Sequence, residues 1–192
     1  CIRDRHTAKQ FFDAFELARK CGFDNINTDL IAGLPTDTPE SFKNSLDSIV
    51  RLNAECITVH TLCMKRASRL TTEGVTLDLQ QARDAREMLA YTQNILGQNE
   101  YIPYYMYRQS RMVGNLENVG WSKRGFESLY NVYVMDETHT ILACGSGGVT
   151  KLKRNNPDYL ERIFNFKYPY EYIDRFDELI QRKSGIMQFY GQ

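Results

Sequence analysis

The sequence lacks features on which several classes of protein depend. Its 24 lysines and arginines are balanced by 24 aspartates and glutamates, so the formal net charge is zero. This balance argues against a protein that binds nucleic acid through bulk positive charge. No hydrophobic run approaches the length of a membrane span, and no signal peptide opens the chain. We therefore expect no nucleic-acid partner, no membrane partner and a cytoplasmic location.

Clustered cysteines are also missing. The five cysteines are odd in number and scattered, and none forms a CxxC or CxxxCxxC motif. We therefore expect no disulfide scaffold, no local zinc finger and no metal ligand in this chain, and a reducing cytosol fits better. The chain begins with Cys1 rather than Met, and no tyrosine precedes Tyr91. We expect a fragment of a longer protein, with two regions that differ in role.

Helical and strand-like segments alternate in the first region. Helix caps are expected at Thr7, Thr38 and Asp78, each followed by apolar residues at helical spacing. The strand-like segments span 25–32, 56–62 and 101–107. This alternation predicts an α/β fold with parallel strands joined by right-handed crossovers. Three strands are too few to close a barrel, so we expect more strands upstream, and Pro103 fits an edge strand.

The pattern changes in the second region, which we place at 111–192 after a first region of 1–110. Residues 129–144 are predicted to form a β-hairpin with its turn at 136–138, because two strand-like runs flank polar residues. A C-terminal helix is marked by Ile173, Phe176 and Ile180.

One face of each of the first two strands carries polar groups. Asn27 and Asp29 share a face of the first strand, and Thr58 and His60 share a face of the second, because side chains alternate along a strand. Parallel strands covered on both sides are normally apolar on both sides. We interpret the polar face as the lining of a wet or ligand-filled cavity. The alternative is that Asn27 and Asp29 bond only to neighbouring loops and that His60 is a structural histidine.

A distinctive string connects these elements to a known family. Residues 27–35 read Asn-Thr-Asp-Leu-Ile-Ala-Gly-Leu-Pro, and residues 38–42 read Thr-Pro-Glu-Ser-Phe. This segment resembles that of oxygen-independent coproporphyrinogen III oxidases, also called dehydrogenases, which are radical S-adenosylmethionine enzymes of the HemN type. Three further segments resemble the HemZ branch of the family: 58–62 with 65–68, then 104–109, then 114–120. The resemblance covers nearly the whole chain.

The resemblance implies a fold and a reaction. The family fold is a partial (β/α) barrel that holds a [4Fe–4S] cluster and S-adenosylmethionine. This chain matches the second half of that barrel, with parallel strands, followed by a smaller α+β C-terminal domain. In the family, a 5′-deoxyadenosyl radical abstracts hydrogen from coproporphyrinogen III, and two propionates become the vinyl groups of protoporphyrinogen IX in haem biosynthesis. The cluster cysteines would lie upstream, so this chain alone should not turn over.

Partners and an alternative function also follow from the resemblance. We expect coproporphyrinogen III as the substrate, an electron acceptor of unknown identity, and a monomer. A sister branch looks like haem chaperones, which share the fold without oxidising porphyrinogens. The segments at 65–68 and 104–118 favour the dehydrogenase branch. A generic nucleotide-binding domain is disfavoured because no GxGxxG motif follows a strand.

Some residues match family positions near S-adenosylmethionine. Asp29 matches a contact residue, and its carboxylate suits a ribose hydroxyl or a cationic group, with a structural aspartate as the alternative. Cys63 matches a position whose backbone lies near a second S-adenosylmethionine, and Val149 aligns with an apolar contact there. The family has an arginine at position 4, where this sequence has aspartate, so Arg3 or Arg5 is the candidate substitute.

Basic residues after the strands are candidates for binding the substrate's propionates, because carboxylates are best held by arginine forks or by lysine. The main candidates are Arg66, Arg69 and Arg108, and further ones are Lys65, Arg111 and Lys151. Each of them alone is more typical of a solvated surface charge. A cluster of tyrosines could stack on a tetrapyrrole, although core packing is favoured for most of them: Tyr101, Tyr104, Tyr105 and Tyr107.

Overall fold

The computed structural model describes residues 6–64, 78–109, 112–156 and 158–191. The chain divides into two compact units, Cys1–Ser128 and Leu129–Gln192, and each is described by itself. The sequence analysis places the boundary between the two regions after residue 110, whereas the two units of the structure divide after Ser128. The division falls later because residues 118–122 pair into the sheet of the first unit.

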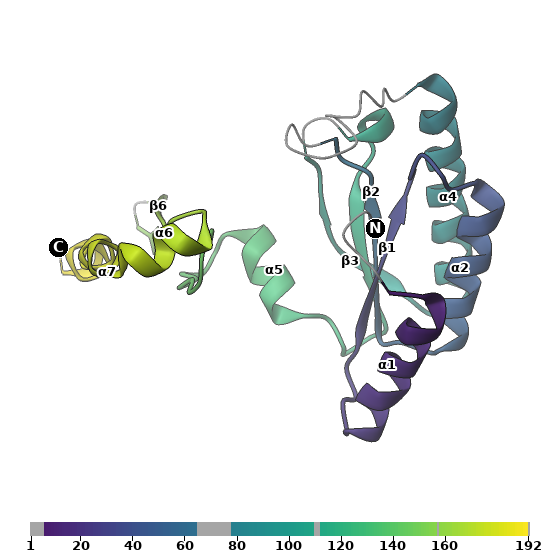
Figure 1. Ribbon diagram of the computed structural model, residues 1–192, viewed down its shortest axis with the longest axis horizontal. Coiled ribbons are helices and arrows are strands. Elements are labelled where there is room, and N and C mark those ends of the chain that lie inside the picture. The colour runs from purple at the N-terminus through teal and green to yellow at the C-terminus, as the bar shows by residue number, and fades with distance from the viewer. Residues whose placement is uncertain (1–5, 65–77, 110–111, 157, 192) are drawn as a thin grey trace. The chain divides into compact units, whose positions relative to one another are not determined.

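The first unit alternates helices and strands as the sequence predicts (Figure 1). Its elements are α1 (Ala8–Lys20), β1 (Asn27–Ala32), α2 (Pro39–Arg51), β2 (Cys56–Thr61), α4 (Leu79–Gln98), β3 (Ile102–Tyr107), the 3₁₀ turn η1 (Val113–Asn115) and β4 (Asn118–Ser122). Thr7, Thr38 and Asp78 each form a capping box that satisfies free N–H groups at the start of α1, α2 and α4. The three expected helix starts are confirmed.

The strands of the first unit form a sheet in the order β1-β2-β4-β3. β1 and β2 pair in parallel, as predicted, from Asn27 opposite Cys56 onward. The sequence analysis missed β4, which pairs antiparallel with both β2 and β3 and separates them. β3 still runs in the direction of β1 and β2. Pro103 lies in this edge strand beside a register shift, which confirms its expected place because proline cannot donate to a strand ladder.

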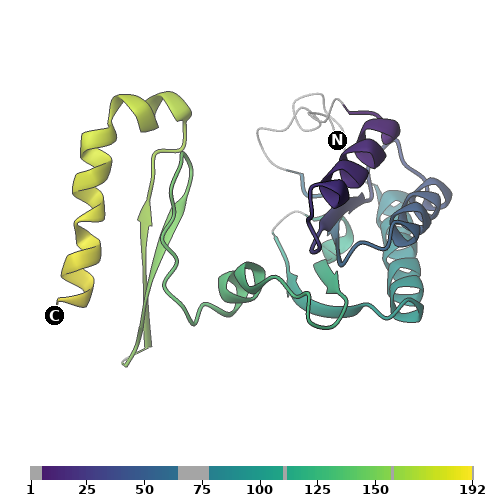
Figure 2. The same ribbon diagram turned by 90° about the horizontal axis from the view of Figure 1, so that it is seen from below.

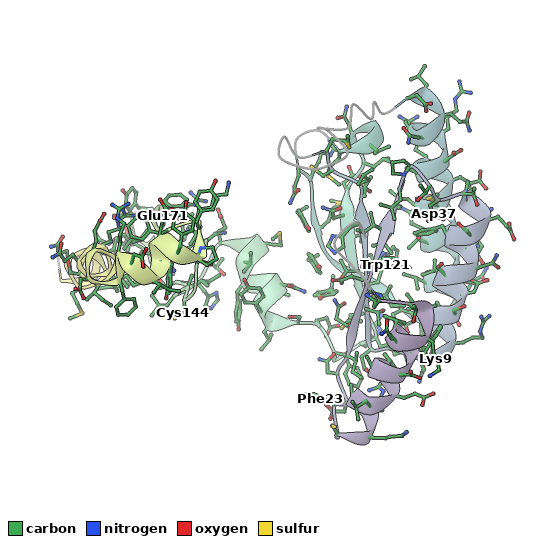
Figure 3. The ribbon with its side chains drawn as sticks, viewed as in Figure 1. Lys9, Phe23, Asp37, Trp121, Cys144 and Glu171 are labelled. Carbon is green, nitrogen blue, oxygen red and sulfur yellow. The ribbon has the colours of Figure 1, made fainter. Side chains whose placement is uncertain are left out.

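Apolar side chains close one face of this sheet. They pack between the strands and helices α1, α2 and α4, which Figure 2 shows from a second direction. The core includes Phe15, Phe42, Leu46, Ile57, Val59, Met88, Leu96 and Trp121, the last of which is labelled in Figure 3. Fully burying one such side chain contributes about 1.5–3 kcal/mol. The polar residues therefore lie on the other face of a sheet whose apolar face is already covered.

The second unit contains α5 (Leu129–Asp136), β5 (Val149–Asn155), β6 (Asp158–Phe164), α6 (Pro169–Asp174), α7 (Phe176–Lys183) and α8 (Gly185–Tyr190). The hairpin predicted over 129–144 is wrong in position. Its first strand is helix α5, and its second contributes an isolated bridge between Ile141 and Lys151. The observed hairpin is β5–β6, with Val149 opposite Phe164. The expected C-terminal helix is divided, because Ile173 lies in α6 whereas Phe176 and Ile180 lie in α7.

In the described part of the chain, no helix combines the length and apolar character needed to cross a membrane.

Candidate functional site

A row of residues crosses all four strands on the polar face of the first unit's sheet. Asp29 of β1 pairs with Thr58 of β2, and Thr58 pairs with Gly120 of β4. Gly120 in turn pairs with Tyr105 of β3. Partners in adjacent strands present their side chains to the same face. The predicted polar face of β1 and β2 therefore extends across the whole sheet to β3.

Gly120 allows the two sides of this row to meet. A Cβ atom at Gly120 would lie 1.8 Å from Cε1 of Tyr105, which is far inside van der Waals contact. The missing side chain lets the Tyr105 ring lie across β4. Its hydroxyl oxygen then comes within 3.3 Å of Oγ1 of Thr58 on β2. A glycine inside a strand often marks such a close approach.

The hydrogen bonds along the row have defined directions. An ionised carboxylate can only accept, so the contact of 2.7 Å between Asn27 and Asp29 uses Nδ2 of Asn27 as the donor. Oδ1 of Asn27 then accepts from the Thr58 hydroxyl at 3.1 Å. When the Thr58 hydroxyl donates to Asn27, the Tyr105 hydroxyl is the donor in its contact with Oγ1 of Thr58. The chain of donors thus runs from Tyr105 through Thr58 and Asn27 to Asp29.

A second set of contacts approaches Asp29 from β2 and β3. Nε2 of His60 lies 3.9 Å from Oδ1 of Asp29, and Nδ1 of His60 lies 3.3 Å from the Tyr107 hydroxyl. The Tyr105 and Tyr107 rings stack with an interplanar angle of 5° and centroids 6.3 Å apart. Both tyrosine contacts therefore link β3 with the polar groups of β1 and β2.

These neighbours stabilise the charged form of Asp29. Its interaction with His60 is the main effect that lowers the pKa of the Asp29 carboxyl; partial burial opposes it, and the Asn27 amide lowers the pKa further. Burial raises the pKa of both Tyr105 and Tyr107, so each hydroxyl keeps its proton at neutral pH. The Asp29 side chain remains 59% exposed. The face thus presents an accessible anion with two protonated tyrosines behind it.

The other predicted cofactor residues are described one by one, each within its own unit. Cys63 follows β2 and forms an isolated bridge with Met112, at the carboxyl end of the parallel pair. Val149 begins β5 in the second unit. Arg5 lies outside the described residues, as does Arg3. Asp29 is the predicted cofactor residue that the structure surrounds with other polar groups of the sheet.

The predicted substrate-binding residues are placed only in part. Arg108 follows β3, is 57% exposed and pairs with Glu117. Lys151 is engaged within the second unit, where it donates to Glu137 at 2.8 Å and to the Val134 carbonyl oxygen at 3.2 Å. The remaining candidates lie outside the described residues: Lys65, Arg66, Arg69 and Arg111.

Sequence reasoning underestimated the contributions of β3 and β4. Tyr105 and Tyr107 were assigned mainly to core packing, and Gly120 was noted only as part of a motif. Tyr101 does belong to the core, where burial raises its pKa to about 12. The alternation of Tyr105 and Tyr107 along one strand is the signal that would have placed both on the polar face.

No cluster of three or more cysteine, histidine or acidic side chains suited to a metal occurs within the described ranges. A [4Fe–4S] cluster therefore does not fit the residues that the structure describes. The Asp29 carboxylate, in contrast, fits a ligand that carries hydroxyl or cationic groups.

A scan against models of protein families finds none that matches the chain. Among curated proteins, the chain is 36% identical over 187 residues to the oxygen-independent coproporphyrinogen-III oxidase-like protein HemZ of Bacillus subtilis strain 168. It is 30% identical over 160 residues to the heme chaperone HemW of Lactococcus lactis subsp. lactis strain IL1403. These matches cover 97% and 79% of this chain, but only 37% of HemZ and 38% of HemW.

A solved structure shares the fold. The coproporphyrinogen III oxidase HemN of Escherichia coli, described as a radical SAM enzyme, matches with a TM-score of 0.60. The match covers 91% of this chain and 39% of HemN at 19% sequence identity.

The open α/β sheet with its polar face is the C-terminal portion of the HemN fold. At the level of sequence, the chain is homologous to HemZ.

Proposed function

We propose that this chain is part of a radical S-adenosylmethionine dehydrogenase acting on coproporphyrinogen III. The reaction oxidatively decarboxylates two propionates to vinyl groups and gives protoporphyrinogen IX. The observation that carries the proposal is the polar sheet face with Asp29 at its exposed end, in a chain homologous to HemZ. The Asp29 carboxylate stays accessible on this face, whereas Thr58 beside it is almost completely buried.

In this proposal Asp29 accepts a hydrogen bond from a ribose hydroxyl of S-adenosylmethionine. Its low pKa keeps it a pure acceptor at neutral pH. Cys63, Val149 and Arg5 are proposed as further contacts to this cofactor. When bound, S-adenosylmethionine supplies the radical that abstracts hydrogen from the substrate. The described residues hold no group of three or more cysteine, histidine or acidic side chains that could ligate a cluster.

Arg108 is proposed to hold a propionate of the substrate, together with Arg66 and Arg69. Arg108 follows β3 at the same sheet edge at which Cys63 follows β2, because the two strands run in one direction. Its guanidinium already binds the Glu117 carboxylate, which shows that the side chain can reach a carboxylate at this position. A substrate propionate would replace Glu117 as the partner.

A second candidate function is haem binding without porphyrinogen oxidation. It is favoured by the similarity to HemW, whose name describes a heme chaperone. The two functions differ in chemistry, because a chaperone binds haem and leaves coproporphyrinogen III unchanged.

The test is a chimaera in which this chain replaces the matching segment of Bacillus subtilis HemZ. We expect the protein, reconstituted anaerobically with iron and sulfide, to convert coproporphyrinogen III into protoporphyrinogen IX. Asp29→Ala should remove this conversion, whereas Asp13→Ala should retain it, because Asp13 lies on α1 and pairs with Lys9. Haem binding with no conversion in a chimaera that carries its cluster would instead support the chaperone function.

A further inference from the structure

The Asp29 carboxylate is exposed, yet its orientation is determined by Asn27 on its own strand and by neighbours on β2 and β3. A side chain that is 59% exposed is not held by packing. An unrestrained aspartate side chain on a strand exchanges between rotamers, and the conformational entropy that it loses when a ligand binds weakens the affinity. The hydrogen bond from Asn27 is therefore the contact that fixes Asp29 before binding.

Asn27 is itself held on its other side. Its Oδ1 accepts from Thr58, which is almost completely buried, and Thr58 accepts from Tyr105. A flipped amide would turn its oxygen toward the Asp29 carboxylate and lose that hydrogen bond, so the observed amide orientation is favoured. The Tyr105 ring occupies the space above Gly120, which fixes the far end of the chain.

His60 has a similar anchor. When the Tyr107 hydroxyl donates to Nδ1, the neutral imidazole carries its proton on Nε2, the nitrogen that lies 3.9 Å from Asp29. At this distance the interaction is electrostatic rather than a direct hydrogen bond. The contact with Tyr107 thus holds the imidazole with its Nε2 side toward the Asp29 carboxylate.

We propose that Asn27 and His60 are positioning residues for the Asp29 carboxylate, and that Tyr105 and Tyr107 of β3 hold them in place through two converging sets of contacts. The inference rests on the proposed function for the identity of the ligand, a ribose hydroxyl of S-adenosylmethionine. The arrangement prepares Asp29 to accept a hydrogen bond in one orientation. Loss of either set of contacts should weaken binding without removing the carboxylate.

The first measurement needs no ligand. The Asp29 carboxyl carbon is followed by ¹³C NMR through an acid titration of the full chain and of Thr58→Val, Tyr105→Phe and Tyr107→Phe. We expect the Asp29 pKa to move up toward its ordinary value in each variant. Thr58→Ser should retain the wild-type titration because it keeps the hydroxyl. The other titratable groups near Asp29 are His60, Tyr105, Tyr107 and His6, which lines a cavity together with Asp29; their titrations are recorded in the same experiment.

The second measurement is calorimetric titration of the same proteins, and of Asp29→Ala, with S-adenosylmethionine. Loss of one positioning hydrogen bond should raise the dissociation constant about three- to tenfold. Two control variants make the same types of substitution at residues that do not lie on the polar face. Thr28→Val alters the opposite face of β1, and Tyr101→Phe removes a hydroxyl that donates to the Ala54 carbonyl oxygen. Both controls should keep the Asp29 titration and the affinity.

The outcomes separate the two proposals. Unchanged Asp29 titration in Thr58→Val and Tyr105→Phe would overturn the positioning role, as would equal shifts in the two controls. If the titrations shift as expected but no protein binds S-adenosylmethionine, the positioning role stands and the proposed ligand is wrong. If only Asp29→Ala weakens binding, the proposed ligand stands and the positioning role is wrong.

Discussion

Substitution of Gly120 by alanine tests the contact on which the polar row depends. The new Cβ atom would lie 1.8 Å from Cε1 and 2.3 Å from Cδ1 of Tyr105. The Tyr105 ring must swing away, which breaks its hydrogen bond with Thr58 and its stack on Tyr107. Overpacking of this kind costs about 1–3 kcal/mol. We therefore expect Gly120→Ala to lower the free energy of unfolding by that amount.

A double-mutant cycle with Tyr105→Ala isolates the cause. Alanine is intrinsically better than glycine in a strand by about 0.5–1 kcal/mol, so Gly120→Ala should be neutral or stabilising once the ring is gone. Urea unfolding can be followed by the fluorescence of Trp121, the sole tryptophan, which lies in the core beside Gly120. An equal loss of stability in both backgrounds would refute the collision as the cause.

Three further predictions concern the first unit. Arg19→Met should lower the free energy of unfolding at neutral pH by about 2 kcal/mol, because Nη2 of the partly exposed Arg19 donates to both oxygens of the nearly buried Glu55 at 2.7 Å. Burial raises the pKa of the Glu55 carboxyl, but the contact with Arg19 helps to bring that pKa below its ordinary value of 4.5. The stability that this ion pair contributes is therefore present above pH 4.5 and lost as the pH falls through the folded-state pKa. In urea unfolding at acid pH, the free energies of the wild type and the variant should converge, and a constant difference between them would contradict this prediction. Tyr101 should ionise only near pH 12, so the protonated hydroxyl contributes its full share to the stability of the fold below pH 10 and loses it between about pH 10 and 12. The difference in absorbance at 295 nm between the wild type and Tyr101→Phe follows this ionisation, and a midpoint near pH 10 would contradict the prediction. Thr38→Ala should cost about 1 kcal/mol in urea unfolding through loss of the cap on α2, and a change below about 0.3 kcal/mol would show that the cap contributes little.

The elements that sequence predicted best are those with strong local signals. The caps at Thr7, Thr38 and Asp78 precede apolar residues at helical spacing, so local hydrogen bonding and burial favour the same boundaries. β1 and β2 were recognised because their apolar faces pack against helices. Asp29 was identified as a site residue from its family motif, and its polar neighbours on β1 and β2 from strand alternation.

The elements that sequence missed depend on tertiary contacts. α5 is rich in aromatic and β-branched residues, which favour strands, yet Leu129–Asp136 forms a helix. β5 carries three cationic side chains that obscure its alternation, and Lys151 pairs with Glu137, which lies 14 residues away in the sequence. β4 is short and contains Gly120, and the absence of a side chain at Gly120 leaves space for the Tyr105 ring of β3.

The central claim is that the polar face of the β1-β2-β4-β3 sheet binds a ligand. The direct measurement is a map of backbone amide chemical shifts as S-adenosylmethionine is added to the full chain. The account predicts that the largest changes occur around Asp29 and His60, with little change at Ile57 on the helix-covered face. Shifts centred on the helix-covered face, or none at saturating cofactor, would contradict it.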